Sequence, residues 1–176
     1  MKRVILICGT MGVGKTRTCR ELQKVLDRNV FLDGDWCWDA QPFVVNDFTK
    51  RMVVDNIVYM LNSFIACPDY ENVIFCWVMH QQAIIDSIVS RLKGEFDLSV
   101  FALTCSRDAL ERRIMGDVAA GLRKADVIGR SAERLALYDG LKGAAIIDTT
   151  NIAPDEAARM IADKLMQTLA ERSRYK

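Results

Sequence analysis

The sequence has 176 residues, of which 51% are apolar and 27% are charged, and its net charge is +1. This length and composition are typical of one globular domain with a sizeable core. The near-zero charge gives no electrostatic reason to expect nucleic acid or an anionic membrane as a partner. No apolar run reaches the roughly 18–20 residues that a membrane helix needs. We therefore expect a single domain over residues 1–176.

Segments that are short and apolar alternate along the chain with segments of helical periodicity. The apolar segments predict β-strands at residues 4–8, 30–32, 72–79, 98–104 and 144–148. The periodic segments predict helices at residues 15–27, 45–66, 81–93, 107–115, 131–141 and 154–172, with residues 116–129 too polar to assign. This alternation predicts an α/β fold, with a five-stranded parallel sheet and helices on both of its faces.

The six cysteines form no CxxC pair and have no metal-ligand spacing. Cys8, Cys76 and Cys105 fall in or beside predicted strands, where a reduced thiol acts as a small buried hydrophobe. The apolar run near the N-terminus is short and leads into a glycine-rich loop rather than a cleavage site, so a signal peptide is not predicted. These features indicate a reducing, cytoplasmic compartment.

The segment GTMGVGKT follows the first predicted strand and matches the pattern G-x-x-x-x-G-K-[ST] at every fixed position. Such a loop points backbone N–H groups inward, and the helix that follows directs the positive end of its dipole at an anion. Lys15 would reach the β- and γ-phosphates of a nucleotide, and the Thr16 hydroxyl would bind Mg²⁺. The predicted nucleotide-binding residues here are Gly9, Thr10, Met11, Gly12, Val13, Gly14, Lys15, Thr16 and Arg17. A chance glycine-rich turn is the competing interpretation, and the position between strand and helix disfavours it.

The second predicted strand ends in FLDGD, which places Asp33 and Asp35 two residues apart. Residues two apart on a strand share a face, so both carboxylates could face the phosphate loop. Asp33 could hold a water on Mg²⁺, and Asp35 could orient or deprotonate an acceptor hydroxyl. An alcohol oxygen needs such a base because it is a weak nucleophile until its proton is removed. A plain Asp-Gly turn is the alternative.

Four segments together resemble the small P-loop kinases: GTMGVGKT, LDGD, CSRDALERRI and DTTNIAPDEAARMI. This group includes shikimate kinase, gluconate kinase, adenylylsulfate kinase, chloramphenicol phosphotransferase and many uncharacterised nucleotide-kinase-like proteins, and the resemblance covers nearly the whole chain. It implies a P-loop NTPase fold with a helical lid near residues 113–130. It also implies transfer of the γ-phosphoryl group of ATP, with Mg²⁺, to a hydroxyl or phosphate of a small molecule, such as a nucleoside, a nucleotide or an antibiotic.

The resemblance also implies roles for individual residues. Lid arginines in such kinases clamp the transferring phosphoryl group, because their charge is permanent and their donors fork to fit phosphate oxygens. Here the candidates are Arg113, Arg123 and Arg130, whereas Arg112 is expected on a solvated helix face. Asn151, in the loop after the fifth strand, would border the adenine.

Two features depart from the pattern of the group. The third strand, VIFCWVMH, ends without the carboxylate that holds Mg²⁺ in many P-loop proteins, so Asp33 would do more of the metal work. The lid lacks a closely spaced arginine pair, since Asp117 lies four residues beyond Arg113. These departures keep open a second function, a nucleotide-binding switch with little turnover.

The sequence does not predict the acceptor, the base of the nucleotide or the oligomeric state. Trp36 could stack on a planar acceptor or pack under the following helix. His80 could contact substrate or cap the surface. Lys50 and Arg51 could hold an anionic acceptor or lie on a solvated helix face.

Overall fold

The computed structural model of the protein describes residues 1–174, and the side chains of residues 1–167. Its sheet has five parallel strands in the order β2-β3-β1-β4-β5. The strands are β1 (Lys2–Cys8), β2 (Asn29–Asp33), β3 (Asn72–Cys76), β4 (Phe96–Thr104) and β5 (Ala144–Asp148). The predicted five-stranded parallel sheet is confirmed, and β1 lies at its centre.

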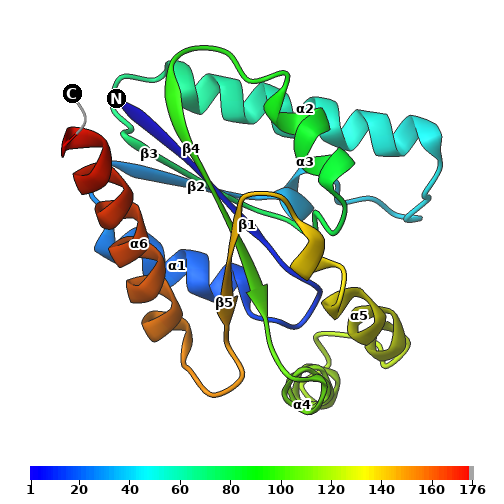
Figure 1. Cartoon of the computed structure of the whole chain (residues 1–176). Helices are drawn as coiled ribbons and strands as arrows, with labels where there is room; N and C mark the ends of the chain where they lie inside the picture. The colour runs from blue at the N-terminus through cyan, green and yellow to red at the C-terminus, as the bar shows by residue number, and fades with distance from the viewer. Residues whose placement is uncertain (175–176) are drawn as a thin grey trace.

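Helices cover both faces of the sheet (Figure 1). One face carries α1 (Lys15–Val25) and α6 (Pro154–Arg174), and the other carries α2 (Asp47–Ala66) and α3 (Gln82–Val89). Beyond the carboxyl ends of the strands lie α4 (Arg107–Ala119) and α5 (Val127–Leu135). Two short 3-10 helices complete the chain, η1 (Gly34–Cys37) and η2 (Tyr138–Gly140).

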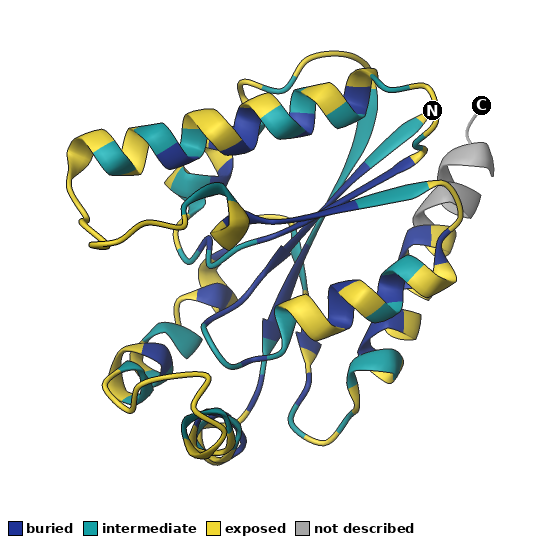
Figure 2. Ribbon diagram, turned by 180° about the vertical axis from the view of Figure 1, so that it is seen from behind, coloured by how far each residue is buried: buried dark blue, intermediate teal, exposed yellow. Residues whose placement is uncertain are grey.

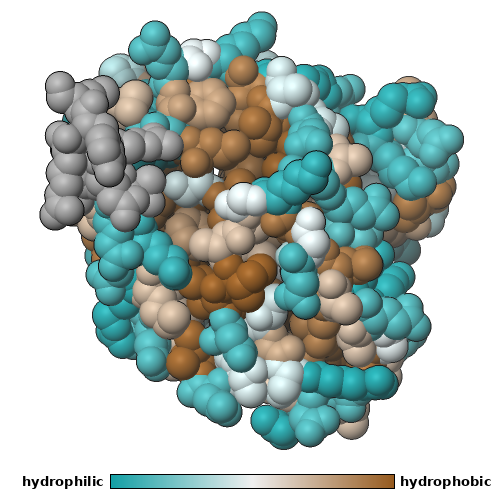
Figure 3. Space-filling view, in the orientation of Figure 1, coloured by the Kyte–Doolittle hydropathy of each residue, from teal (hydrophilic) through white to brown (hydrophobic). Residues whose placement is uncertain are grey.

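The core has two layers, one on each side of the sheet. Because side chains alternate across a strand, Ile5 and Ile7 of β1 pack toward α1 and α6, and Val4 and Leu6 pack toward α2 and α3. Figure 2 shows the buried residues concentrated on the strands and on the inward stripes of the helices. In the view of Figure 3, apolar side chains also reach the surface near the edge strand β5, where Ile146 is 42% exposed.

The third strand is shorter than predicted. It ends at Cys76, which pairs with Ile7 of β1 and with Asp33 of β2, and both of these partners are the last in their ladders. Residues 77–80 lie beyond these ladders, although the Trp77 backbone N–H still donates to the carbonyl of Ile7 in β1, and Met79 has a φ of 30°. An apolar run therefore shows which residues are buried, but not where the pairing stops.

The DGD segment also differs from its predicted form. Asp33 is the last residue of β2, but Asp35 lies in η1, so the two carboxylates do not share a strand face. The turn forms because the Asp33 side chain accepts a hydrogen bond from the Asp35 backbone N–H at 3.1 Å and caps η1. Several helix boundaries differ as well: α4 continues past Gly116, α3 ends at Val89 rather than at residue 93, and the helix expected at 131–141 lies at 127–135. Within the described residues, no helix is long and apolar enough to cross a bilayer.

Candidate nucleotide and phosphoryl-transfer site

The phosphate loop joins β1 to α1 and packs against α4. Gly12 has a φ of +82°, and a Cβ built there would lie 2.5 Å from Cγ1 of Ile114. Only glycine fits this position, since both the backbone conformation and the space exclude a side chain. The loop is therefore held in shape by the lid side of the molecule as well as by the sheet.

Lys15 lies at the start of α1 with its ammonium turned into the loop. Its Nζ donates a hydrogen bond to the backbone carbonyl of Thr10 at 3.0 Å. Burial lowers the pKa of Lys15, and the nearby carboxylates of Asp35 and Asp33 act in the opposite direction. A phosphate group in the loop would likewise favour the charged form, because an opposite charge at short range offsets the loss of hydration.

Thr16 and Asp33 form the pair predicted to hold the metal. The Thr16 hydroxyl donates to Oδ2 of Asp33 at 2.6 Å, and the Asp33 side chain is 5% exposed. A hydroxyl and a carboxylate side by side suit Mg²⁺, which prefers oxygen ligands and takes the rest from phosphates and water. The described residues contain no group of three or more His, Cys, Asp or Glu that could hold a metal by themselves.

Asp35 is exposed, but its side chain is held in place by Trp77. The indole Nε1 of Trp77 donates to Oδ1 of Asp35 at 3.1 Å. The ring lies against Gly34, where a Cβ would come within 2.5 Å of Cγ of Trp77. Sequence reasoning missed Trp77, because the predicted third strand, residues 72–79, placed it inside the strand rather than just after its end.

Arg113 connects three parts of the site. Its Nη1 donates to the backbone carbonyl of Val13 at 3.2 Å and to Oγ1 of Thr149 at 3.0 Å, and its Nη2 donates to the backbone carbonyl of Thr149. Thr149 is itself tied to the end of β4, since its backbone N–H donates to the carbonyl of Thr104 at 2.8 Å. The guanidinium thus links α4, the phosphate loop and the loop after β5.

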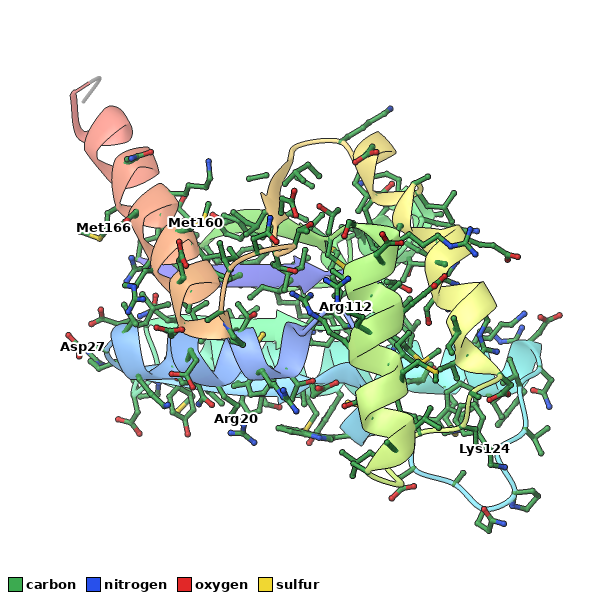
Figure 4. The ribbon with its side chains drawn as sticks, turned by 90° about the horizontal axis from the view of Figure 1, so that it is seen from below. Arg20, Asp27, Arg112, Lys124, Met160 and Met166 are labelled. Carbon is green, nitrogen blue, oxygen red and sulfur yellow. The ribbon has the colours of Figure 1, made fainter. Side chains whose placement is uncertain are left out.

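These residues surround a cavity of about 770 Å³ at the carboxyl ends of the strands. Its wall includes residues 11–18 of the phosphate loop and α1, the carboxylates Asp33 and Asp35, and residues 152–154 after β5. The lid side of the wall carries Arg112, Arg113, Gly116, Asp117, Ala120, Leu122 and Arg123. In Figure 4, Arg112 lies on the side of α4 that faces α1, and Lys124 lies farther along the lid.

The remaining predicted site residues fall in different places. Arg17 and Arg123 line the cavity, and Nε of Arg123 donates to Asp117 at 2.9 Å. Arg112, expected on a solvated face, is exposed and also lines the cavity. Arg130 on α5 and Asn151 after β5 are exposed and lie outside the residues that line this cavity.

The candidate acceptor residues do not gather at the cavity. Trp36 stacks edge to face on Phe31 at 5.2 Å, the Arg20 guanidinium lies over both rings, and Trp36 is not among the residues that line the cavity. Lys50 pairs with Asp47 at 3.5 Å on the exposed face of α2. His80 is half-buried, its Nδ1 has no partner among the described residues, and burial followed by the charge of Arg134 lowers the pKa of His80.

The strand order and the loop after β1 define a P-loop NTPase fold. A family model described as an AAA domain matches residues 5–136, and the chain therefore belongs to this family of P-loop proteins. No curated protein sequence matches the chain with significance.

Several solved structures are similar over nearly the whole chain. The tunicamycin resistance protein of Deinococcus radiodurans is 20% identical with a TM-score of 0.66, over 94% of this chain and 96% of that chain. A gluconokinase from Sinorhizobium meliloti 1021 is 16% identical with a TM-score of 0.71, over 97% of each chain. Shikimate kinase from Acinetobacter baumannii in complex with shikimate is 18% identical with a TM-score of 0.62, over 96% of this chain and 95% of that chain. The resemblance to small P-loop kinases is thus confirmed at the level of the fold.

Proposed function

We propose that the protein is a kinase that transfers the γ-phosphoryl group of ATP to a hydroxyl of a small molecule. The observation that carries this proposal is the place of Asp35. Its carboxylate lines the same cavity as Lys15 and Thr16, so a base stands beside the loop that would hold the phosphates. A protein that only binds nucleotides has no use for such a base, whereas phosphoryl transfer to an alcohol does.

The proposed chemistry is mostly positioning and electrostatic stabilisation. The loop N–H groups and Lys15 would bind the β- and γ-phosphates, and Thr16 and Asp33 would hold Mg²⁺, which supplies positive charge next to the phosphate oxygens when bound. The acceptor oxygen forms a bond to the γ-phosphorus, the bond to the ADP oxygen breaks, and the acceptor proton passes to Asp35. Residues 113–130 would act as the lid, with Arg123 facing the transferring group.

The charges near Asp35 favour an uncharged acceptor over a phosphorylated one. Residues 33–49 contain four aspartates, Asp33, Asp35, Asp39 and Asp47, and no lysine or arginine. The first cation that follows, Lys50, already pairs with Asp47. Of these aspartates, Asp33 and Asp35 line the cavity, and a phosphate acceptor beside them would meet like charges, a repulsion that disfavours binding.

The experiment measures ADP production from Mg·ATP in the presence of candidate acceptors. The acceptors are tested in matched neutral and charged pairs: a nucleoside with its monophosphate, and an aldose with its sugar acid. Antibiotics are tested as well. The antibiotics are included because of the fold shared with a tunicamycin resistance protein. We expect turnover with a neutral acceptor, lost in Lys15→Ala. We also expect Asp35→Asn to lose turnover while it keeps ATP affinity. Turnover with the monophosphate but not with its nucleoside would contradict the proposal that the acceptor group is a hydroxyl rather than a phosphate.

A nucleotide-binding switch with little turnover is the second candidate, and one observation favours it. Two of the three arginines predicted to clamp the phosphoryl group already have protein partners, since Arg113 donates to backbone carbonyls and Arg123 pairs with Asp117. Under this function, Asp35→Asn would change nothing in nucleotide binding or turnover. Tight Mg·ATP binding with no acceptor-stimulated turnover would support it.

A further inference from the structure

Asp35 is fixed at both its backbone and its side chain, although it is exposed. Its N–H donates to Oδ1 of Asp33 at 3.1 Å, and its own Oδ1 accepts from Nε1 of Trp77 at 3.1 Å. Among the described residues, no hydrogen bond is formed by the second carboxylate oxygen, Oδ2. A carboxylate bound at one oxygen keeps a defined orientation and presents the other oxygen to the cavity.

Trp77 is itself held in place by the sheet. It is the first residue after β3, and its backbone N–H donates to the carbonyl of Ile7 in β1 at 3.2 Å. In the register of the sheet, the preceding residue Cys76 pairs with Asp33, so Trp77 comes directly beside Gly34. A side chain at position 34 would collide with the ring, which explains the glycine between the two aspartates.

We infer that Trp77 is a positioning residue for Asp35, an inference that rests on the proposed kinase function. The end of β3 carries no carboxylate, and it supplies instead an indole donor that holds the proposed base. Without this hydrogen bond, an exposed carboxylate would rotate freely, and the geometry needed for proton transfer would be reached less often. Trp77 acts through Asp35 and does not itself touch the acceptor.

The test uses Trp77→Phe, which keeps an aromatic ring against Gly34 and removes the N–H donor. We expect kcat to fall by about ten- to a hundredfold, because the lost hydrogen bond is made to a charged group. The KM for ATP should stay unchanged, since no atom of the phosphate loop is altered. The matched control is Trp36→Phe, whose ring contacts Phe31 and Arg20 outside the cavity, and it should keep full kcat.

A double-mutant cycle separates positioning from general damage to the fold. In the Asp35→Asn background, Trp77→Phe should cause no further loss of the residual kcat that remains without the base, because the two residues act as one unit. Gly34→Ala disrupts the same contact without changing Trp77 itself, since the added Cβ displaces the indole ring. Gly140→Ala is its control, because Gly140 lies outside the proposed lid and nothing lies within 4 Å of a Cβ at that position. Additive losses in the cycle would overturn the inference.

A spectroscopic readout does not depend on activity. The chain has three tryptophans and so three indole N–H signals in a ¹H–¹⁵N spectrum, which single Trp→Phe variants assign. Asp35→Asn should shift the signal of Trp77 and leave those of Trp36 and Trp38 in place. An unshifted Trp77 signal would overturn the contact and the inference with it. A shifted signal in a protein without acceptor-dependent turnover would overturn the proposed function, and with it the catalytic role of Trp77, while the contact itself stands.

Discussion

The hydroxyl of Thr10 in the phosphate loop donates a hydrogen bond to the backbone carbonyl of Ser131 in α5 at 2.9 Å. Both residues are fully buried, and they are 121 positions apart in the chain. The contact ties the second residue of the loop to α5, the helix in which the proposed lid ends. The conformation of the phosphate loop and the position of α5 are therefore coupled through a single buried hydrogen bond.

Thr10→Val tests this coupling, since it keeps the shape of the side chain and removes the donor. We expect the free energy of unfolding to fall by about 1–2 kcal/mol, because a buried hydrogen bond is lost without a replacement partner. Thr10→Ser, which keeps a hydroxyl, is the control and should lose less. Urea unfolding measures both, and equal stability of Thr10→Val and the wild type would show that the bond contributes nothing.

The proposed Mg²⁺ site at Thr16 and Asp33 leads to a prediction about how ATP binding depends on Mg²⁺. Thr16→Val and Asp33→Asn should each weaken the extra affinity that Mg²⁺ gives to ATP by about tenfold or more, because each removes one oxygen ligand or its charge. Thr16→Ser keeps the hydroxyl and should retain most of the effect. Calorimetric titration of ATP with and without Mg²⁺ measures this difference. An undiminished Mg²⁺ effect in Thr16→Val would place the metal elsewhere.

Arg113 should be important for stability as well as for the site. Arg113→Met removes the guanidinium that donates to Val13 and Thr149. We expect the free energy of unfolding to fall by about 2 kcal/mol, because the lost donor is charged and its acceptors keep no partner in its place. The ATP affinity should fall too, since both acceptors border the cavity. Arg107→Met is the matched control on the same helix, because its exposed pair with Glu111 should contribute less than about 1 kcal/mol. Similar unfolding curves for the two variants would contradict this role.

Much of the fold could be predicted because its signals are local. Each strand is a short apolar run, and the phosphate loop has a fixed spacing that depends on a single strand, a turn and a helix. The burial of β1 on both faces follows from the same physics, since Ile5 and Ile7 face one core layer and Val4 and Leu6 the other. The strands and the phosphate loop can therefore be predicted from residues that are close together in the sequence.

The contacts that complete the site could not be predicted, because they join segments far apart in the sequence. Trp77 meets Asp35 across 42 positions, and Arg113 meets Val13 across 100. The expectation that Asp33 and Asp35 share a strand face was wrong, because a hydrogen bond between the Asp33 side chain and the Asp35 backbone turns the chain, which propensity does not reveal. The end of β3 likewise depends on where its partners end, and not on its own apolar residues.

The lowered pKa of His80 leads us to expect that the free energy of unfolding depends on pH. Burial, with the nearby charge of Arg134, lowers the pKa of His80 in the folded protein below its ordinary value, near 6.5 in an unfolded chain. The unfolded state therefore binds more protons as the pH falls through that value, and the free energy of unfolding decreases until the folded-state pKa is passed. His80→Gln cannot take up this proton, so its stability should decline less than that of the wild type between pH 7.5 and 5.5. Urea unfolding at several pH values gives the free energy of unfolding of each protein. The contributions of the carboxylates cancel in the difference between the wild type and His80→Gln. Arg134→Gln should reduce the effect by removing the repelling charge, and parallel curves for the wild type and His80→Gln would show that His80 has the same pKa in both states.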